Sequence, residues 1–133
     1  MTAGYSGTPL AKKLSLKDGM SVWFHAMPAS VRAGIDEVVL NERDKPETGL
    51  QAAHIFMTER AELAQWLGDL RTLIDPAGFV WVSWPKKASK VRTDISEDIV
   101  RDVCLPMGWV DVKVCAVDAT WSGLKLMIRK ELR

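Results

Sequence analysis

The sequence has little of several residue types, and each scarcity excludes a class of protein. Its 133 residues include two cysteines and two histidines, which are too few and too widely spaced for a disulfide framework or a metal-ligand motif. No apolar run approaches the roughly 20 residues that a membrane-spanning helix needs, and residues 1–7 lack the basic and apolar regions of a signal peptide. The sequence therefore predicts a cytoplasmic protein with no metal site and no membrane association.

Several functional motifs are also absent, namely the G-x-S-x-G of nucleophile-elbow hydrolases, the P-loop and the G-x-G-x-x-G of dinucleotide-binding proteins. Basic residues number 18 against 17 acidic residues, and this near balance does not favour a general nucleic-acid binder. The charge is unevenly distributed, with +3 over residues 1–35, −5 over residues 36–77 and +3 over residues 78–133. The ends of the chain are basic and its middle is acidic.

Length and composition predict one domain over residues 1–133. A chain that is 47% hydrophobic and of this length can bury roughly two-thirds of its unfolded surface, so it needs no disulfide to fold. Cys104 and Cys115 lie within apolar runs and are expected in the core. Residues 1–18 are expected to be a helical lead-in, with Thr8 as the helix cap and Pro9 at the first helical position.

Apolar runs and helix signals alternate along the rest of the chain. The expected strands are residues 20–24, 35–40, 52–57, 79–84, 109–117 and 124–128. The expected helices are residues 29–34, 59–74 and a segment that begins after Asp94 and ends at Gly108.

Local signals support these boundaries. Thr58 is expected to cap the helix over residues 59–74, Asp94 is expected to cap the following helix with Glu97 in a capping box, and residues 75–78 are expected to turn. Glu37 marks the second strand as an edge strand. In the fifth strand, alternation puts Val110, Val112, Val114 and Ala116 on one face.

Strands that alternate with helices pair in parallel through right-handed crossovers, whereas two strands joined by a short turn form an antiparallel hairpin. The sequence therefore predicts a three-layer α/β, Rossmann-like fold with about six mostly parallel strands and a C-terminal antiparallel hairpin.

Over roughly residues 19–130, this order resembles the Rossmann-like fold of class I S-adenosylmethionine-dependent methyltransferases, with about one strand–helix unit missing. Residues 75–82 look like the turn into the fifth strand of that fold. The resemblance implies a Gly-rich turn after the first strand, but residues 24–29 contain no glycine. It also implies a ribose-binding carboxylate after the second strand, for which Glu42 is the nearest candidate. The alternative interpretation of Glu42 is a solvated loop charge.

Three segments resemble a small bacterial family of unassigned function more specifically. They are residues 6–14, residues 84–89 and residues 111–125. That resemblance implies no activity for this chain.

Ligands of open α/β sheets bind beyond the carboxyl ends of the strands. The segments 25–30, 84–93 and 118–123 are expected to share this edge, and the N-terminal lead-in could fold over it. The run from Lys86 to Arg92 contains no acidic residue and precedes a helix, which suits an anion. The candidate ligand-binding residues are Lys12, Lys13, His25, Trp84, Lys86, Lys87, Lys90, Arg92, Asp118, Trp121 and Ser122.

Each candidate also has a structural interpretation. Lysines on a loop or a short helix can be solvated charges, and Trp84 and Trp121 can pack rather than stack on a base. His25 could act as an acid or base but has no visible partner, and His54 lies inside a strand. The catalytic residues are unknown.

The favoured hypothesis is a non-catalytic binding or regulatory module for an anionic small molecule or protein, with no cofactor and with nucleic acid as a less favoured partner. The alternative is a reduced enzyme that uses S-adenosylmethionine, and a structural subunit is a third possibility.

Overall fold

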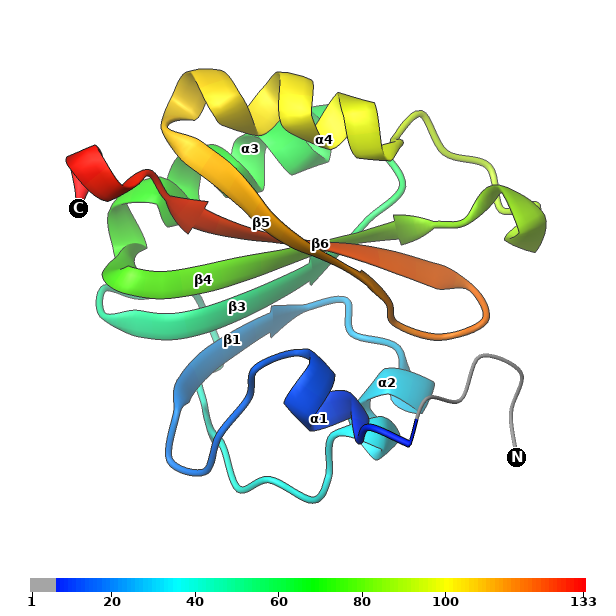
Figure 1. The fold of residues 1–133 in the computed structure, drawn as a ribbon, viewed down its shortest axis with the longest axis horizontal. Coiled ribbons are helices and arrows are strands. Elements are labelled where there is room, and N and C mark those ends of the chain that lie inside the picture. Colours follow the sequence, from blue (N-terminus) through cyan, green and yellow to red (C-terminus); the bar gives the residue numbers. More distant parts are fainter. Residues whose placement is uncertain (1–6) are drawn as a thin grey trace.

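In the computed structural model, which describes residues 7–133, one mixed sheet separates two layers of helices (Figure 1). The strands are β1 (Ser21–His25), β2 (Asn41–Glu42), β3 (Leu50–Phe56), β4 (Ile74–Pro85), β5 (Trp109–Ala116) and β6 (Trp121–Ile128). The helices are α1 (Leu10–Lys13), α2 (Ala29–Gly34), α3 (Arg60–Leu73) and α4 (Glu97–Cys104), with short 3-10 turns at Lys87–Ser89, Leu105–Met107 and Lys130–Leu132.

The strand order β2-β1-β3-β4-β6-β5 confirms the expected fold class. Strands β2, β1, β3 and β4 pair in parallel, and β6 is antiparallel to both of its neighbours, β4 and β5. The last strand thus inserts between β4 and β5, as it does in the fold that the sequence resembles. The carboxyl ends of the parallel strands lie at one edge, where the connections to α2, α3 and α4 begin.

One face of the sheet is covered by α3 and α4 (Figure 1). Helix α3 buries Leu63, Leu67 and Leu70 at three- and four-residue spacing, so its apolar stripe packs continuously on the strands. Trp109 of β5 is fully buried in the same cluster and donates a hydrogen bond from Nε1 to the Leu67 carbonyl at 3.3 Å. This face is an ordinary apolar core.

The opposite face is covered by the shorter helices α1 and α2 (Figure 1). Trp81 of β4 is 1% exposed here and donates from Nε1 to the Leu14 carbonyl at 2.9 Å, which fixes the end of α1 on the sheet. Beside Trp81, the buried His54 of β3 pairs with the Ser83 hydroxyl at 2.7 Å and stacks on Phe56. This face therefore contains polar groups within its core.

The expected second strand over residues 35–40 is wrong. Those residues form the turn after α2, in which Ile35 is buried, and the short strand β2 follows them at Asn41–Glu42. Glu37 is consequently not on an edge strand. Val38 and Leu40 are apolar, which is why the sequence pattern indicated a strand. Both side chains are only partly buried, and they pack from a loop against the core under α1 and α2.

Three expected helix caps are also wrong. Ser96, not Asp94, caps α4 by accepting a hydrogen bond from the Ile99 N–H. Asp94 accepts instead from the Arg60 N–H at 2.7 Å, at the start of α3, where Thr58 had been expected to cap. A carboxylate distant in sequence thus complements the positive end of α3. Similarly, Pro9 and not Thr8 occupies the cap position of α1, which is a single turn.

The expected turn over residues 75–78 lies inside β4 as a bulge. In the pairing of β3 with β4, Leu50 is opposite Ile74, whereas Ala52 is opposite Phe79. Four residues of β4 therefore lie opposite the single residue Gln51 of β3. A Cβ on Gly78 would lie 2.7 Å from the Gln51 carbonyl oxygen. Glycine is therefore required there by the close approach of two backbones.

A second bulge lies between Asp111 and Lys113 of β5 and breaks the expected alternation of its valines. Val112 and Val114 are each about half exposed, while Cys115 is buried on the opposite face. Cys115 and Cys104 are both free thiols in the core, as predicted.

Within residues 7–133, no helix is long and apolar enough to cross a membrane.

Candidate functional site

The three segments expected at the carboxyl edge of the sheet meet there. The Ser30 hydroxyl donates to Asp118 Oδ2 at 3.3 Å, which joins the start of α2 to the β5–β6 turn. The Lys86 N–H donates to the Thr120 carbonyl at 2.8 Å, which joins the end of β4 to the same turn. Tertiary structure thus brings together residues from three distant parts of the chain.

Asp118 has a structural function in this arrangement. Its Oδ1 accepts from the N–H groups of Thr120 and Trp121, each at 2.8 Å, and so closes the turn between β5 and β6. Asx side chains commonly organise turns in this way. One carboxylate therefore shapes the turn that Ser30 and Lys86 contact.

Four lysines from four elements gather on the α1 side of the β5–β6 hairpin. We call Lys13, Lys86, Lys113 and Lys125 the lysine face. Lys113 donates to the Lys13 carbonyl at 3.4 Å, and Lys125 donates to the Ser15 hydroxyl at 3.0 Å. These contacts join the N-terminal α1 segment to the C-terminal hairpin, so the two basic ends of the chain meet in space.

Cys115 lies close enough to three of these lysines to be affected by their charges. Burial raises the pKa of its thiol, and the positive charges of Lys13, Lys113 and Lys86 act on that pKa in the opposite direction. For Lys125, burial lowers the pKa of the ammonium group, and the charge on Lys113 lowers it further. The charges acting on Cys115 and Lys125 are all positive.

Lys113 and Lys125 are direct cross-strand partners. Like charges opposite each other destabilise a sheet, and no lysine of residues 7–133 forms an ion pair that could offset this. Lys125 finds partial compensation over the Phe79 ring, with its Nζ 4.5 Å from the centroid. The lysine face is thus a group of positive charges that form no ion pairs within residues 7–133.

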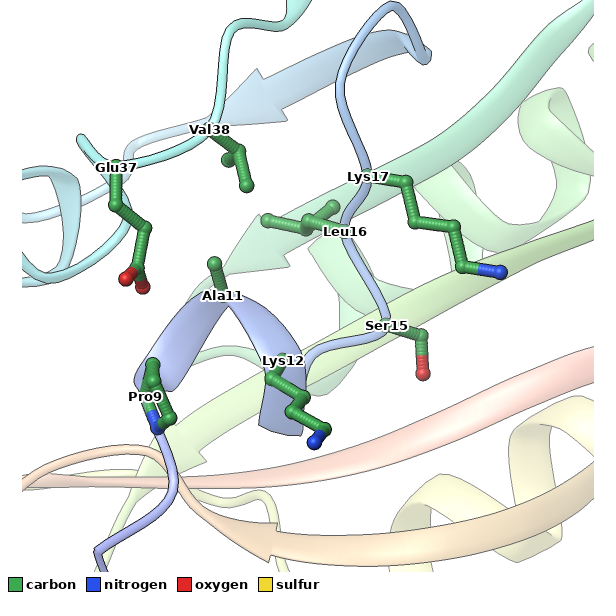
Figure 2. A pocket seen from close by; sticks show the side chains of 8 residues that line it. All are labelled: Pro9, Ala11, Lys12, Ser15, Leu16, Lys17, Glu37 and Val38. Carbon is green, nitrogen blue, oxygen red and sulfur yellow. The ribbon is translucent and has the colours of Figure 1, made fainter.

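Lys12 lies beside the lysine face but belongs to a separate hollow of about 290 Å³ next to α1. In Figure 2, Lys12 and Lys17 lie on one side of the hollow and Glu37 on the other, with Ala11 and Leu16 between them. Both charge signs line this space. The sequence grouped Lys12 with Lys13, whereas α1 directs them to different surroundings.

The remaining basic candidates follow the loop away from the hairpin. Lys87, Lys90 and Arg92 are exposed, and no hydrogen bond or ion pair within residues 7–133 involves their side chains. The loop continues toward α3, where the Thr93 hydroxyl donates to the Thr58 carbonyl at 2.6 Å. The start of α4 is already complemented by the Ser96 cap and two acidic residues, which oppose an anion there.

His25 has a partner that the sequence did not reveal. It ends β1 and pairs with Glu62 of α3, Nε2 to Oε2, at 2.8 Å. Trp66 also donates to Glu62 Oε2, at 3.3 Å, and its ring lies 4.9 Å from that of His25. The group is on the α3 side of the sheet, so it is separate from the lysine face. Within residues 7–133, no cluster of three or more His, Cys, Asp or Glu residues could hold a metal ion.

The turn after β1 retains an unusual backbone conformation. Ala26 has φ of 54°, in the left-handed region that ordinarily favours glycine. The fold that this chain resembles has glycine-rich sequence in this turn. Ala26 therefore has a backbone conformation typical of glycine, although it carries a side-chain methyl group.

Glu42 is exposed to solvent, as the solvated-charge interpretation expects, but it lies in a short strand rather than in a loop. It ends β2, where the resemblance implies a ribose-binding carboxylate, and both of its oxygens accept from Arg32 of α2, at 2.8 and 3.0 Å. The Glu42 hydrogen bond raises the pKa of the Arg32 guanidinium. A bidentate pair of this kind uses one lone pair of each carboxylate oxygen and fixes the orientation of the carboxylate.

Of the other candidates, Trp84 is 7% exposed and belongs to the α3/α4 core, which agrees with its structural interpretation. Trp121 is partly exposed and packs edge-to-face on Phe56, 5.2 Å between centroids. Ser122 is partly exposed, next to Trp121 on β6. Trp121 is thus the aromatic side chain nearest in sequence to the turn that Lys86 contacts.

Lys113, Lys125 and Glu62 were not among the candidates that the sequence indicated. Lys113 and Lys125 interrupt apolar strands, a signal that could have marked them, because a charge in a strand interior faces either solvent or a site. Nothing in the sequence pairs Glu62 with His25, since 37 residues separate them.

No family model matches the sequence, and no curated protein matches it. The resemblance of three segments to a small bacterial family therefore stays a prediction.

Solved structures do match, at low sequence identity. A putative type 11 methyltransferase from Sulfolobus solfataricus has a TM-score of 0.63 and 10% identity, over 91% of this chain and 90% of that one. A SAM-dependent methyltransferase from Aquifex aeolicus has a TM-score of 0.62 and 16% identity, over 90% and 89%. LepI, in a complex with SAH and a substrate analogue, has a TM-score of 0.54 and 8% identity over 92% of this chain, which spans about half of LepI (47%). The chain therefore has the class I methyltransferase fold in a reduced form.

Proposed function

We propose that this protein is a non-catalytic binding module for an anionic ligand or partner, and that the lysine face is its binding surface. The observation that carries the proposal is the direct opposition of Lys113 and Lys125, neither of which forms an ion pair within residues 7–133. Positive charges that repel one another lower stability in the free protein. An anion that neutralises them would recover that free energy on binding.

The position of the surface supports the same proposal. Lys86 directly follows the fourth strand at the carboxyl edge, where open α/β sheets bind their ligands. Lys13 and Lys113 extend the charge from that edge onto the α1 side. The expected site thus moves from the loop after Lys86 to the face of the hairpin.

Titration with inorganic pyrophosphate tests the proposal. We expect binding to weaken about tenfold between 20 and 200 mM NaCl, because exposed charges are screened over roughly a Debye length. The double variant Lys86→Gln/Lys113→Gln should weaken binding about tenfold, as measured by isothermal titration calorimetry. Lys45→Gln is the matched control, because Lys45 follows β2 at the other edge of the sheet. Binding that ignores salt, or that Lys45→Gln weakens equally, would contradict the proposal.

The second candidate is a reduced enzyme that uses S-adenosylmethionine, which the fold and the left-handed turn at Ala26 favour. The residues present do not fit that cofactor. The turn after β1 contains no glycine for close approach, and a ribose at Glu42 would compete with Arg32, which donates to both carboxylate oxygens. We therefore derive no methyl transfer for this chain.

Calorimetry with S-adenosylmethionine and S-adenosylhomocysteine separates the two candidates. We expect no heat of binding for either compound. Arg32→Ala, which frees Glu42, is the informative variant, because binding to this variant alone would identify Arg32 as the obstacle. Micromolar binding to the unaltered protein would overturn the non-catalytic proposal.

A further inference from the structure

β5 is the last strand of the sheet on the hairpin side, and β6 is its partner. The other edge strand, β2, has two residues, whereas β5 has eight. The outer backbone N–H and C=O groups of an edge strand are a template for another strand. β5 therefore offers a long row of hydrogen-bonding groups to a partner.

The two faces of β5 differ in chemistry. Val114 pairs across the hairpin with Leu124, a residue of the α3/α4 core, yet 53% of Val114 remains exposed. Ala116 is on the same face and is also exposed, and Val112 is 52% exposed at the bulge. On the opposite face, Lys113 belongs to the lysine face. An added strand would therefore have apolar neighbours on one side and lysines on the other.

We propose that the outer edge of β5 binds an extended peptide segment in which acidic and apolar residues alternate, and that this segment adds a seventh strand to the sheet. The proposal rests on the proposed function and names its anionic partner. Side chains of a strand point alternately to the two faces, so alternate acidic residues would lie beside Lys113 and the rest of the lysine face. The intervening apolar residues would lie beside Val114 and Ala116.

Two other occupants fit less well. A nucleic-acid strand could neutralise the lysines, but it could not pair with the row of backbone groups on β5. A second copy joined β5 to β5 in antiparallel fashion would bring both lysine faces to the same side of the extended sheet, where they repel. The bulge and Lys113 are also features that oppose flat self-pairing of edges.

The experiment compares four eight-residue peptides by calorimetry and by amide chemical shifts of the ¹⁵N-labelled protein. The first alternates Glu and Val, and the second has the same composition in two blocks. The third and fourth are the first peptide N-methylated at alternate residues, in one phase and in the other. We expect the alternating peptide to bind at least about tenfold more tightly than the block peptide and to shift the amides of residues 110–116. One phase of N-methylation should weaken binding about tenfold, because those amides can no longer donate to β5.

Protein variants locate the site. Val114→Asp and Lys113→Gln are both on exposed positions, so neither should impair folding, and each should weaken binding about three- to tenfold. Lys45→Gln, at the opposite edge, should have no effect. The Lys113→Gln effect should disappear at high salt, because that variant removes only an attractive charge, whereas the part of the Val114→Asp effect that comes from lost apolar contact should remain.

Each contrary result is distinct. Equal binding of the block peptide, or insensitivity to both phases of N-methylation, would overturn strand addition while leaving the anion surface intact. An eight-nucleotide single strand that binds more tightly at the same residues would overturn the peptide proposal in favour of nucleic acid. Dimers in sedimentation that block the peptide would overturn it in favour of a second copy. Failure of the unaltered protein to bind pyrophosphate would count against the proposed function itself.

Discussion

The two faces of the sheet differ in the length of the helices that cover them and in the polarity of their cores. On one face, α3 and α4 contribute 14 and 8 residues of helix to a core that is almost wholly apolar. On the other, α1 and α2 contribute 4 and 6 residues, and the core beneath them includes the His54–Ser83 pair beside the lysine face. The first face supplies stability. The second carries charges and polar groups that cost stability, which is the usual mark of a functional surface.

Matched leucine truncations should give the largest difference between the faces. Leu67→Ala, at a fully buried position of α3, should lower the free energy of unfolding by about 3–5 kcal/mol, because a rigid core leaves a cavity. Leu16→Ala, at a 6% exposed position in the loop after α1, should cost about 2 kcal/mol, because a loop can settle into the space. Urea unfolding measures both values. Equal costs would show that the two faces contribute equally to stability.

The His54–Ser83 pair should make stability depend on pH through the α1/α2 face. Burial lowers the pKa of His54 to about 3 from 6.5. The folded state therefore binds fewer protons than the unfolded state between these values, so stability is complete above about pH 6.5 and is lost as the pH falls toward 3. The loss should be about 1.4 kcal/mol per pH unit, or about 2 kcal/mol at pH 5.

Urea midpoints between pH 5 and 7 measure this dependence above the range in which most carboxylates titrate. His54→Gln removes the titrating group and should flatten the slope. An unchanged slope in that variant would assign the pH dependence to other residues.

Charge removal should have opposite signs on the two faces of β5. Lys113→Gln removes the repulsion with Lys125 and should raise stability by about 0.2–0.5 kcal/mol at low salt. Asp111→Asn breaks the pair in which Asp111 Oδ2 accepts from Arg101 Nε at 3.0 Å, so it should lower stability. Thermal unfolding at 20 mM and 1 M NaCl checks both, since salt should shrink each effect. A loss of stability on Lys113→Gln would remove the main support for the anion surface.

Much of the fold followed from local patterns. The alternation of apolar runs with helix signals predicted the mostly parallel sheet and the closing hairpin, because crossover rules leave few topologies for such a series. The apolar periodicity of Leu63, Leu67 and Leu70 predicted α3 closely. Errors arose where tertiary contacts override local signals, as with Asp94, which caps a helix other than its own.

The candidate site was predictable only in part. The expected meeting of segments 25–30, 84–93 and 118–123 is confirmed by the Ser30–Asp118 and Lys86–Thr120 hydrogen bonds. The sequence did not predict that Lys86 would be separated from Lys87, Lys90 and Arg92. They separate because the loop after Lys86 leads away from the hairpin to Thr58, whose carbonyl accepts a hydrogen bond from Thr93. The partner of His25 and the engagement of Glu42 by Arg32 likewise depend on how helices lie over the sheet.

The sequence alone determined the fold class, since hydrophobic periodicity and turn chemistry are local properties of the chain. It also determined that the ends are basic and the middle acidic. Only the tertiary structure decided that the two ends meet, with Lys13 against Lys113 across 100 residues, because electrostatic potential depends on distance in space. A chain that is nearly neutral in total thereby acquires one strongly positive face.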